Sequence, residues 1–270
     1  MSTVSTVFAN GIWKSGNHLL IKILGRVGFD DANFGIASSS LHGRYYIARQ
    51  VLRGALLRRD PIMVGLDATA AVSDRWIRRQ LHAHRGACIG GHAAYSDHLL
   101  ALLHEAGVFP IQIVRDPRDV VCSFSHWIVR RPDYYAFPAF KDLSVDQRML
   151  ALIRGGRSGK VFLESLATVM DRSFGWLTRP DEVLVVKFED LVGAEGGGSR
   201  QRQDEAIASI VRWVGVRGSS ISEISADLFG GTATFRRGQT NTWKDEFSDE
   251  VTAVFRSIVG DRLSEWGYAW

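Results

Sequence analysis

The sequence TVFANGIWKSGNHLLIKIL, residues 6–24, predicts a strand, a short loop and a helix in succession. Residues 6–9 favour a strand, Gly11 ends it, and apolar residues recur at helical spacing from position 19 onward. Backbone N–H groups in such a loop point to one spot in front of the helix N-terminus, where they bind phosphate or sulfate. Because Lys14 adds a full positive charge at this spot, the stretch predicts an anion-binding site.

The position of the lysine distinguishes this loop from that of an ATP- or GTP-binding protein. P-loops of that kind read GxxxxGK[ST], with the lysine after the second glycine and a hydroxyl group that holds magnesium. Gly11 and Gly16 keep the glycine spacing, but Asn17 and His18 stand at the lysine and hydroxyl positions. The loop therefore disfavours an ordinary nucleoside triphosphatase. Taken alone, it fits a plain strand–helix turn with a solvated lysine equally well.

Composition and charge limit the class of protein. The 270 residues suffice for a large core, and we expect one domain over residues 1–270. A net charge of +4 suits an anionic ligand, but the basic residues form no block that indicates nucleic acid. Cys88 and Cys122 form no disulfide framework, and each lies in an apolar run typical of a buried thiol. The sequence shows no transmembrane stretch and no signal peptide, so we expect a cytoplasmic protein.

Short apolar strands alternate with helices along the chain, which predicts a three-layer α/β fold with a mostly parallel central sheet flanked by helices. Residues 28–41 are predicted to form a loop. Residues 42–59 are predicted to form a basic helix that can face solvent, line an anionic site or contact a membrane surface. The other predicted strands are 62–66, 87–91, 109–114 and 182–187, and the other predicted helices are 73–81, 96–105, from 118, 144–154, 160–176, 203–214 and 248–263.

Polar residues follow three of these strands. The carboxyl ends of parallel strands meet in one crevice, so we expect loop 11–16, His92 and Arg115 to converge. Arg115 and Ser123 on the next helix predict a phosphate clamp, although this motif taken alone is better explained by an Arg–Asp surface network with a turn proline. His92 is a candidate general base, although a lone histidine is more often structural. Residues 235–244, FRRGQTNTWK, form a basic loop that can close over an anion.

In this order, the stretches resemble the sulfotransferases that use 3′-phosphoadenosine-5′-phosphosulfate (PAPS). Lys14-Ser15-Gly16 resembles that family's 5′-phosphosulfate loop, and Arg115 with Ser123 resembles its 3′-phosphate motif. The segment VKFEDL, residues 186–191, resembles its aromatic–Glu–Asp segment, and residues 236–244 resemble its C-terminal RxG…WK loop. Any one of these motifs is weak evidence for the family, whereas four in order are specific.

The resemblance implies that the protein transfers a sulfuryl group from PAPS to a hydroxyl or amine by in-line displacement. The product would be 3′-phosphoadenosine-5′-phosphate (PAP), and no metal is implied. It implies catalytic roles for Lys14, His92 and Ser123, with His92 as the base and Lys14 stabilising the departing oxygen. It implies donor binding by Lys14, Ser15, Gly16, Asn17, His18, Arg115, Ser123, Phe188, Arg236, Arg237 and Gly238.

The sequence departs from the family pattern at several of these positions. Gly90 and Gly91 stand where the family often has lysine and threonine, so His18 and His98 are reserve candidates for the base. Phe188 replaces an adenine-contacting tyrosine and lacks its hydroxyl group. The dimer segment of the animal enzymes is not kept, so the resemblance implies no oligomeric state; its key positions hold Ser248, Asp249 and Ala253.

Two other functions remain open at the level of the sequence. One is a kinase-like phosphotransferase that requires magnesium-ATP, and the other is a nucleotide-binding protein without turnover. Hydroxyl-bearing small molecules, glycolipids and natural-product scaffolds are all compatible acceptors. Segments 34–58 and 127–143 match no family motif and are expected to line the acceptor site, the second with Trp127, Tyr134, Tyr135, Phe137 and Phe140.

Overall fold

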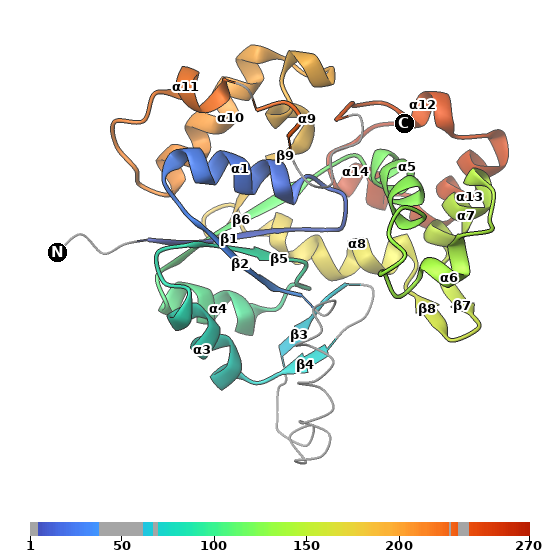
Figure 1. Ribbon diagram of the computed structural model, residues 1–270, viewed down its shortest axis with the longest axis horizontal. Coiled ribbons are helices and arrows are strands. Elements are labelled where there is room, and N and C mark those ends of the chain that lie inside the picture. The colour runs from blue at the N-terminus through green and yellow to red at the C-terminus, as the bar shows by residue number, and fades with distance from the viewer. Residues whose placement is uncertain (1–4, 38–61, 67–69, 227, 232–237) are drawn as a thin grey trace.

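The computed structural model describes residues 5–37, 62–66, 70–226, 228–231 and 238–270 (Figure 1). Its centre is a five-stranded sheet in the order β2-β5-β1-β6-β9, in which every neighbouring pair is parallel. The predicted three-layer α/β fold is therefore confirmed. The sheet strands are β1 (Thr6–Gly11), β2 (Asp31–Ile36), β5 (Cys88–Gly91), β6 (Val108–Val114) and β9 (Leu184–Lys187).

Helices cover both faces of the sheet (Figure 1). Val7 and Ala9 pack on one face with α1 (Asn17–Val27) and α10 (Arg200–Trp213), while Phe8 packs on the other with α3 (Asp74–Ala83) and α4 (Asp97–Glu105). This alternation follows from the two-residue period of a strand. The same side of the sheet as α1 also carries α9 (Phe188–Leu191) and α11 (Ile221–Ser225).

A third group of helices packs beyond the carboxyl ends of the strands and has its own apolar core. Its members are α5 (Pro117–Ile128), α6 (Phe137–Phe140), α7 (Val145–Arg154), α8 (Leu166–Phe174), α12 (Trp243–Glu246), α13 (Asp249–Val259) and α14 (Arg262–Glu265). Two antiparallel pairs lie outside the main sheet: β3 (Ile62–Val64) with β4 (Ala70–Val72), and β7 (Gly156–Ser158) with β8 (Val161–Leu163).

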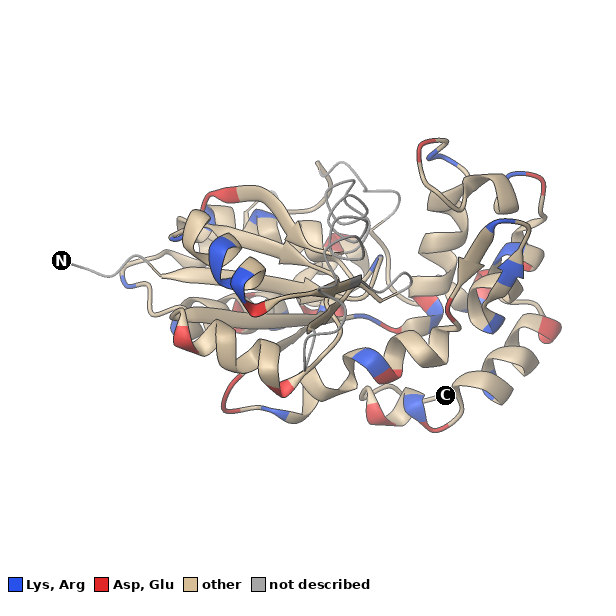
Figure 2. Ribbon diagram, turned by 90° about the horizontal axis from the view of Figure 1, so that it is seen from below, with Lys and Arg blue, Asp and Glu red and all other residues tan. Residues whose placement is uncertain are grey.

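Serine residues cap many of these helices. The hydroxyls of Ser73 and Ser96 accept from backbone N–H groups at the starts of α3 and α4, and Ser144 forms a capping box with Gln147 at α7. None of the described helices is long and apolar enough to cross a membrane. Basic and acidic residues are interspersed along the helices in the view of Figure 2.

The structure corrects four local predictions. Residues 28–41 contain the edge strand β2, which pairs on one side only and so lacks a continuous apolar run. Residues 62–66 contribute β3, which pairs with β4 rather than with the main sheet. The predicted helix 160–176 starts at Leu166, after the β7–β8 hairpin, and the last helix is interrupted at Gly260, where φ is 54°. The predicted helix 42–59 lies entirely outside the described residues.

The sheet topology determines where a ligand can bind. After β1 the chain forms β2 and β5 on one side of β1, and it then crosses to form β6 and β9 on the other side. The connections therefore diverge at the carboxyl end of β1. Open α/β sheets bind ligands at such a switch point, and the loop that begins at Ile12 lies there.

Candidate active site

The loop between β1 and α1 is held in a compact shape. The Ser15 hydroxyl is fully buried and donates to the Ile12 carbonyl at 2.6 Å. Lys14 has a φ of 62° and Gly16 a φ of 111°, which turn the chain into the helix. Asn17 Nδ2 donates to the Gly91 carbonyl at 2.7 Å, which ties the start of α1 to the end of β5. The hydroxyl of Ser15 is thus used within the loop.

His92 follows β5 and lies against the end of β1. Its Nδ1 is 2.6 Å from the Gly11 carbonyl oxygen. Because a carbonyl can only accept, Nδ1 carries the hydrogen and Nε2 carries the lone pair of the neutral ring. Ala93, the residue after His92, is held by the buried side chain of Asn10. This side chain accepts from Ala93 N at 2.8 Å and donates to Ala93 O at 3.2 Å.

The two reserve histidines lie in different surroundings. His18 is on the first turn of α1, and partial desolvation and the charges of Lys14 and His92 lower its pKa. His98 is on α4 and lies 2.9 Å from the Asp74 carboxylate of α3. His18 is therefore in the same corner as Lys14 and His92, whereas His98 is engaged in a contact between α3 and α4.

Arg115 connects the first loop with the C-terminal loop. Its guanidinium donates to the carbonyls of Lys14 at 3.2 Å and Gln239 at 3.0 Å. It stacks 4.4 Å from the centre of the Phe188 ring, and that ring in turn packs against Gly16. Only 7% of Arg115 is exposed, and desolvation lowers its pKa. Among the described residues, its Nε has no hydrogen-bond partner. The predicted convergence of loop 11–16, His92 and Arg115 is confirmed.

The remaining residues of the predicted donor site are Ser123, Arg236, Arg237 and Gly238. Ser123 lies half-buried on α5, and no hydrogen bond joins it to Arg115. Gly238 packs close to Gly196, where an added Cβ would come within 2.5 Å of the Gly238 carbonyl oxygen. Arg236 and Arg237 lie outside the described residues.

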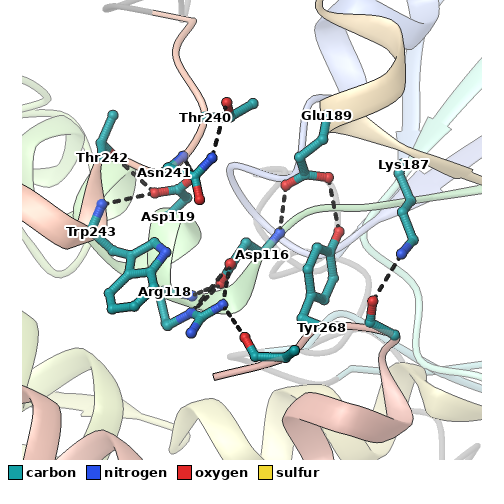
Figure 3. A network of polar contacts seen from close by, with 12 residues as sticks. Asp116, Arg118, Asp119, Lys187, Glu189, Thr240, Asn241, Thr242, Trp243 and Tyr268 are labelled. Carbon is teal, nitrogen blue, oxygen red and sulfur yellow. Dashed lines mark hydrogen bonds and ion pairs between the residues drawn. The ribbon is translucent and has the colours of Figure 1, made fainter. Parts of the chain in front are cut away.

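Asp119 was not singled out by the sequence, and it anchors the C-terminal loop (Figure 3). Its carboxylate is almost fully buried and accepts from Asn241 N at 2.7 Å, Thr242 Oγ1 at 2.9 Å and Trp243 N at 3.0 Å. Burial raises the pKa of this carboxyl, while the nearby Arg115 lowers it. The acidic residues of the Arg115–Asp119 motif therefore form a buried network, and the surface network considered from sequence is wrong.

Aromatic rings lie beside Lys14. Its ammonium group is 5.4 Å from the centre of the Trp127 ring, which lies 5.0 Å from the half-buried ring of Tyr134. Tyr135 follows at 4.8 Å from Tyr134, whereas Phe140 is part of the apolar core. The half-buried rings of segment 127–143 thus reach the first loop. Most of segment 34–58 lies outside the described residues.

Cys88 and Cys122 are both buried, as expected. Desolvation raises the pKa of the Cys88 thiol to about 12, so this thiol stays protonated. Within the described residues, no group of three or more histidine, cysteine, aspartate or glutamate side chains could hold a metal ion.

Comparison with known proteins links this geometry to one fold. No protein-family model matches the chain, and no curated protein matches it. A solved structure of mouse sulfotransferase SULT7A1 complexed with PAP matches 99% of this chain and 90% of its own, with a TM-score of 0.60 and 13% identity. Retinol dehydratase in complex with androsterone and inactive cofactor PAP matches 98% of this chain and 82% of its own, with a TM-score of 0.58 and 16% identity. A second structure of retinol dehydratase, in complex with retinol and PAP, matches 100% of this chain and 84% of its own, with a TM-score of 0.56 and 15% identity. The chain shares the fold of these PAP-bound structures, which include a sulfotransferase.

Proposed function

We propose that the protein is a sulfotransferase that uses PAPS and releases PAP. The observation that carries this proposal is the convergence of Lys14, His92 and Arg115 at the carboxyl end of β1, which supplies a cation, a base and an anion clamp together. In the reaction, a bond forms between the acceptor oxygen and sulfur while the bond from sulfur to the 5′-phosphate oxygen breaks. The acceptor proton passes to the protein.

His92 is the proposed base. The hydrogen bond from Nδ1 to the Gly11 carbonyl leaves Nε2 as the basic nitrogen and orients the ring. In this proposal Nε2 removes the proton from the acceptor hydroxyl. A positioned base of this kind contributes roughly 10²–10⁴ in rate.

Lys14 is the proposed stabiliser of the leaving group. Its positive charge lies in a loop whose backbone is fixed by the Ser15 hydroxyl and the Arg115 guanidinium. Charge develops on the oxygen that stays with PAP, and a fixed cation stabilises it without reorganisation. Ser123 is proposed to assist in this corner through its hydroxyl group.

Arg115 is the proposed centre of 3′-phosphate binding. Its buried Nε lacks a hydrogen-bond partner among the described residues, and burial disfavours its charge, so a nearby phosphate would offset both costs. The other proposed donor ligands are the loop residues Ser15, Gly16, Asn17 and His18, the ring of Phe188, Ser123, and the C-terminal loop with Arg236, Arg237 and Gly238.

The acceptor is proposed to be a hydroxyl-bearing small molecule that lies against Trp127 and Tyr134. Both rings are half-buried, Trp127 lies beside Lys14, and Tyr134 lies beside Trp127. Aromatic linings are typical of such sites. Two of the structural neighbours are bound to androsterone and to retinol, which supports an apolar small molecule. We also propose that the protein works in the cytoplasm, because a chain with only two cysteines, Cys88 and Cys122, has no disulfide framework.

Thermal unfolding in the presence of PAP tests the proposed function. A ligand at about 100 times its Kd adds about 2.7 kcal/mol of stability, so Tm should rise by roughly 5 °C. Magnesium-ATP at the same concentration should leave Tm nearly unchanged. A rise with magnesium-ATP alone would instead support a phosphotransferase. PAP binding without sulfate transfer to any acceptor would support a binding protein that lacks turnover.

Arg115→Lys tests the phosphate clamp. Lysine keeps the charge but loses the planar fork, so we expect PAP to bind at least about tenfold more weakly. Arg148→Lys is the matched control, because Arg148 also donates to a backbone carbonyl, that of Ser125 at 3.1 Å, but on α7. Calorimetric titration with PAP measures both variants. Equal PAP affinity in Arg115→Lys and the native protein would rule out the clamp.

A further inference from the structure

Tyr268 and Ala269 close a ring of hydrogen bonds with Glu189, Asp116 and Arg118 (Figure 3). The Tyr268 hydroxyl donates to Glu189 Oε2 at 2.9 Å, and Asp116 N donates to Glu189 Oε1 at 2.9 Å. The Asp116 carboxylate accepts from Arg118, with the shortest contact at 2.7 Å. Arg118 Nη2 completes the ring by donating to the carbonyl of Ala269 at 2.8 Å.

The ring is adjacent in sequence to two residues of the proposed donor site. Arg115 directly precedes Asp116, and Phe188 directly precedes Glu189. Their side chains stack on each other at 4.4 Å. The position of the stacked pair therefore depends on two backbone segments that Glu189 holds together through Asp116 N.

We propose that Tyr268 is a positioning residue for donor binding. It acts through Glu189 and Asp116 to keep the Arg115 guanidinium stacked on the Phe188 ring. This inference rests on the proposed function, because it concerns the same donor site. Nothing in the sequence motifs points to Tyr268, which lies 80 residues after Phe188.

The environment of the ring explains why a single oxygen atom matters. Asp116 and Arg118 are nearly fully buried, at 7% and 4% exposure. Burial raises the pKa of Glu189, and the Tyr268 hydroxyl opposes that rise. Desolvation and Glu189 also raise the pKa of Tyr268, so its hydroxyl keeps the proton that it donates. Without this donor, Glu189 Oε2 would lose its partner, and the carboxylate would be free to turn away from Asp116 N.

Tyr268→Phe removes only the hydroxyl group and tests the proposal. We expect PAP to bind about tenfold more weakly, the scale of one hydrogen bond to a charged group. Arg118→Lys opens the ring on its other side, since lysine cannot form the fork to Asp116, and it should also weaken PAP binding. Calorimetric titration below the unfolding temperature measures affinity on folded protein, so a loss of stability alone would not change the result.

Arg262→Gln is the matched control. Arg262 lies on α14, close to Tyr268 in sequence, and forms a fork to Asp171 with contacts of 2.6 and 2.9 Å. The control should lower Tm without changing PAP affinity. If Tyr268→Phe lowers Tm but binds PAP as the native protein does, the positioning role is wrong while the proposed function stands. If the native protein does not bind PAP, both proposals are wrong.

Discussion

Lys14→Met is expected to lower the rate of sulfate transfer by about 10²–10³-fold, the effect of removing one fixed group that stabilises transition-state charge. Methionine keeps an unbranched apolar side chain and removes the ammonium group, which lies 5.4 Å from the centre of the Trp127 ring in the native protein. The positive φ of 62° is already occupied by a residue with a side chain, so the substitution adds no new backbone strain. Release of PAP from PAPS, with any acceptor that supports native turnover, measures the rate.

A second lysine on the neighbouring helix provides the control. Lys22 lies on α1 and donates to the carbonyls of Leu228 and Gly230, both at 3.1 Å. Lys22→Met should reduce stability and leave turnover per folded molecule near the native value. If Lys14→Met also kept native turnover, the leaving oxygen would have to be stabilised by the loop's N–H groups alone, and the proposed role of Lys14 would be wrong.

The placement of the site could be predicted because it follows from a rule about parallel sheets. Loop 11–16, His92 and Arg115 lie far apart in sequence but each follows a strand. Once those strands are parallel neighbours, their carboxyl ends meet, and the contact of His92 with Gly11 and that of Arg115 with Lys14 follow. Apolar runs such as β6 predict the strands themselves, since β6 is buried at nearly every position.

The partners of individual side chains could not be predicted in the same way. Asp119 accepts hydrogen bonds from Asn241 and Trp243, which follow it by 122 and 124 positions. Tyr268 donates to Glu189, which precedes it by 79 positions. Neither contact leaves a local pattern, because a side chain that bonds to a distant backbone has no characteristic spacing. The role of the glycines at 196–198 could not be predicted either. Their composition predicts only a flexible loop, whereas Gly196 is needed because it lets the Gly238 backbone approach closely.

His92→Asn is expected to lower turnover by roughly 10²–10⁴-fold while leaving PAP affinity close to native, because a base acts on the acceptor proton rather than on the donor. Asparagine can still donate a hydrogen bond toward the Gly11 carbonyl, 2.6 Å from Nδ1 in the native protein, but it cannot accept a proton. Turnover at saturating PAPS, compared between the native protein and the variant, measures the loss, and calorimetric titration with PAP measures the donor affinity.

Substitutions of the two reserve candidates, His18 and His98, show which histidine is the base. His98→Asn should keep native turnover, since His98 is engaged with Asp74 at 2.9 Å between α3 and α4. His18 lies in the same corner as Lys14 and His92, and its lowered pKa keeps it neutral, as a base must be. If His92→Asn retained full turnover and His18→Asn lost it, the base would be His18, and the contact of His92 with Gly11 would serve only to join β5 to β1. The pair of variants therefore separates a catalytic histidine from a structural one at the same strand end.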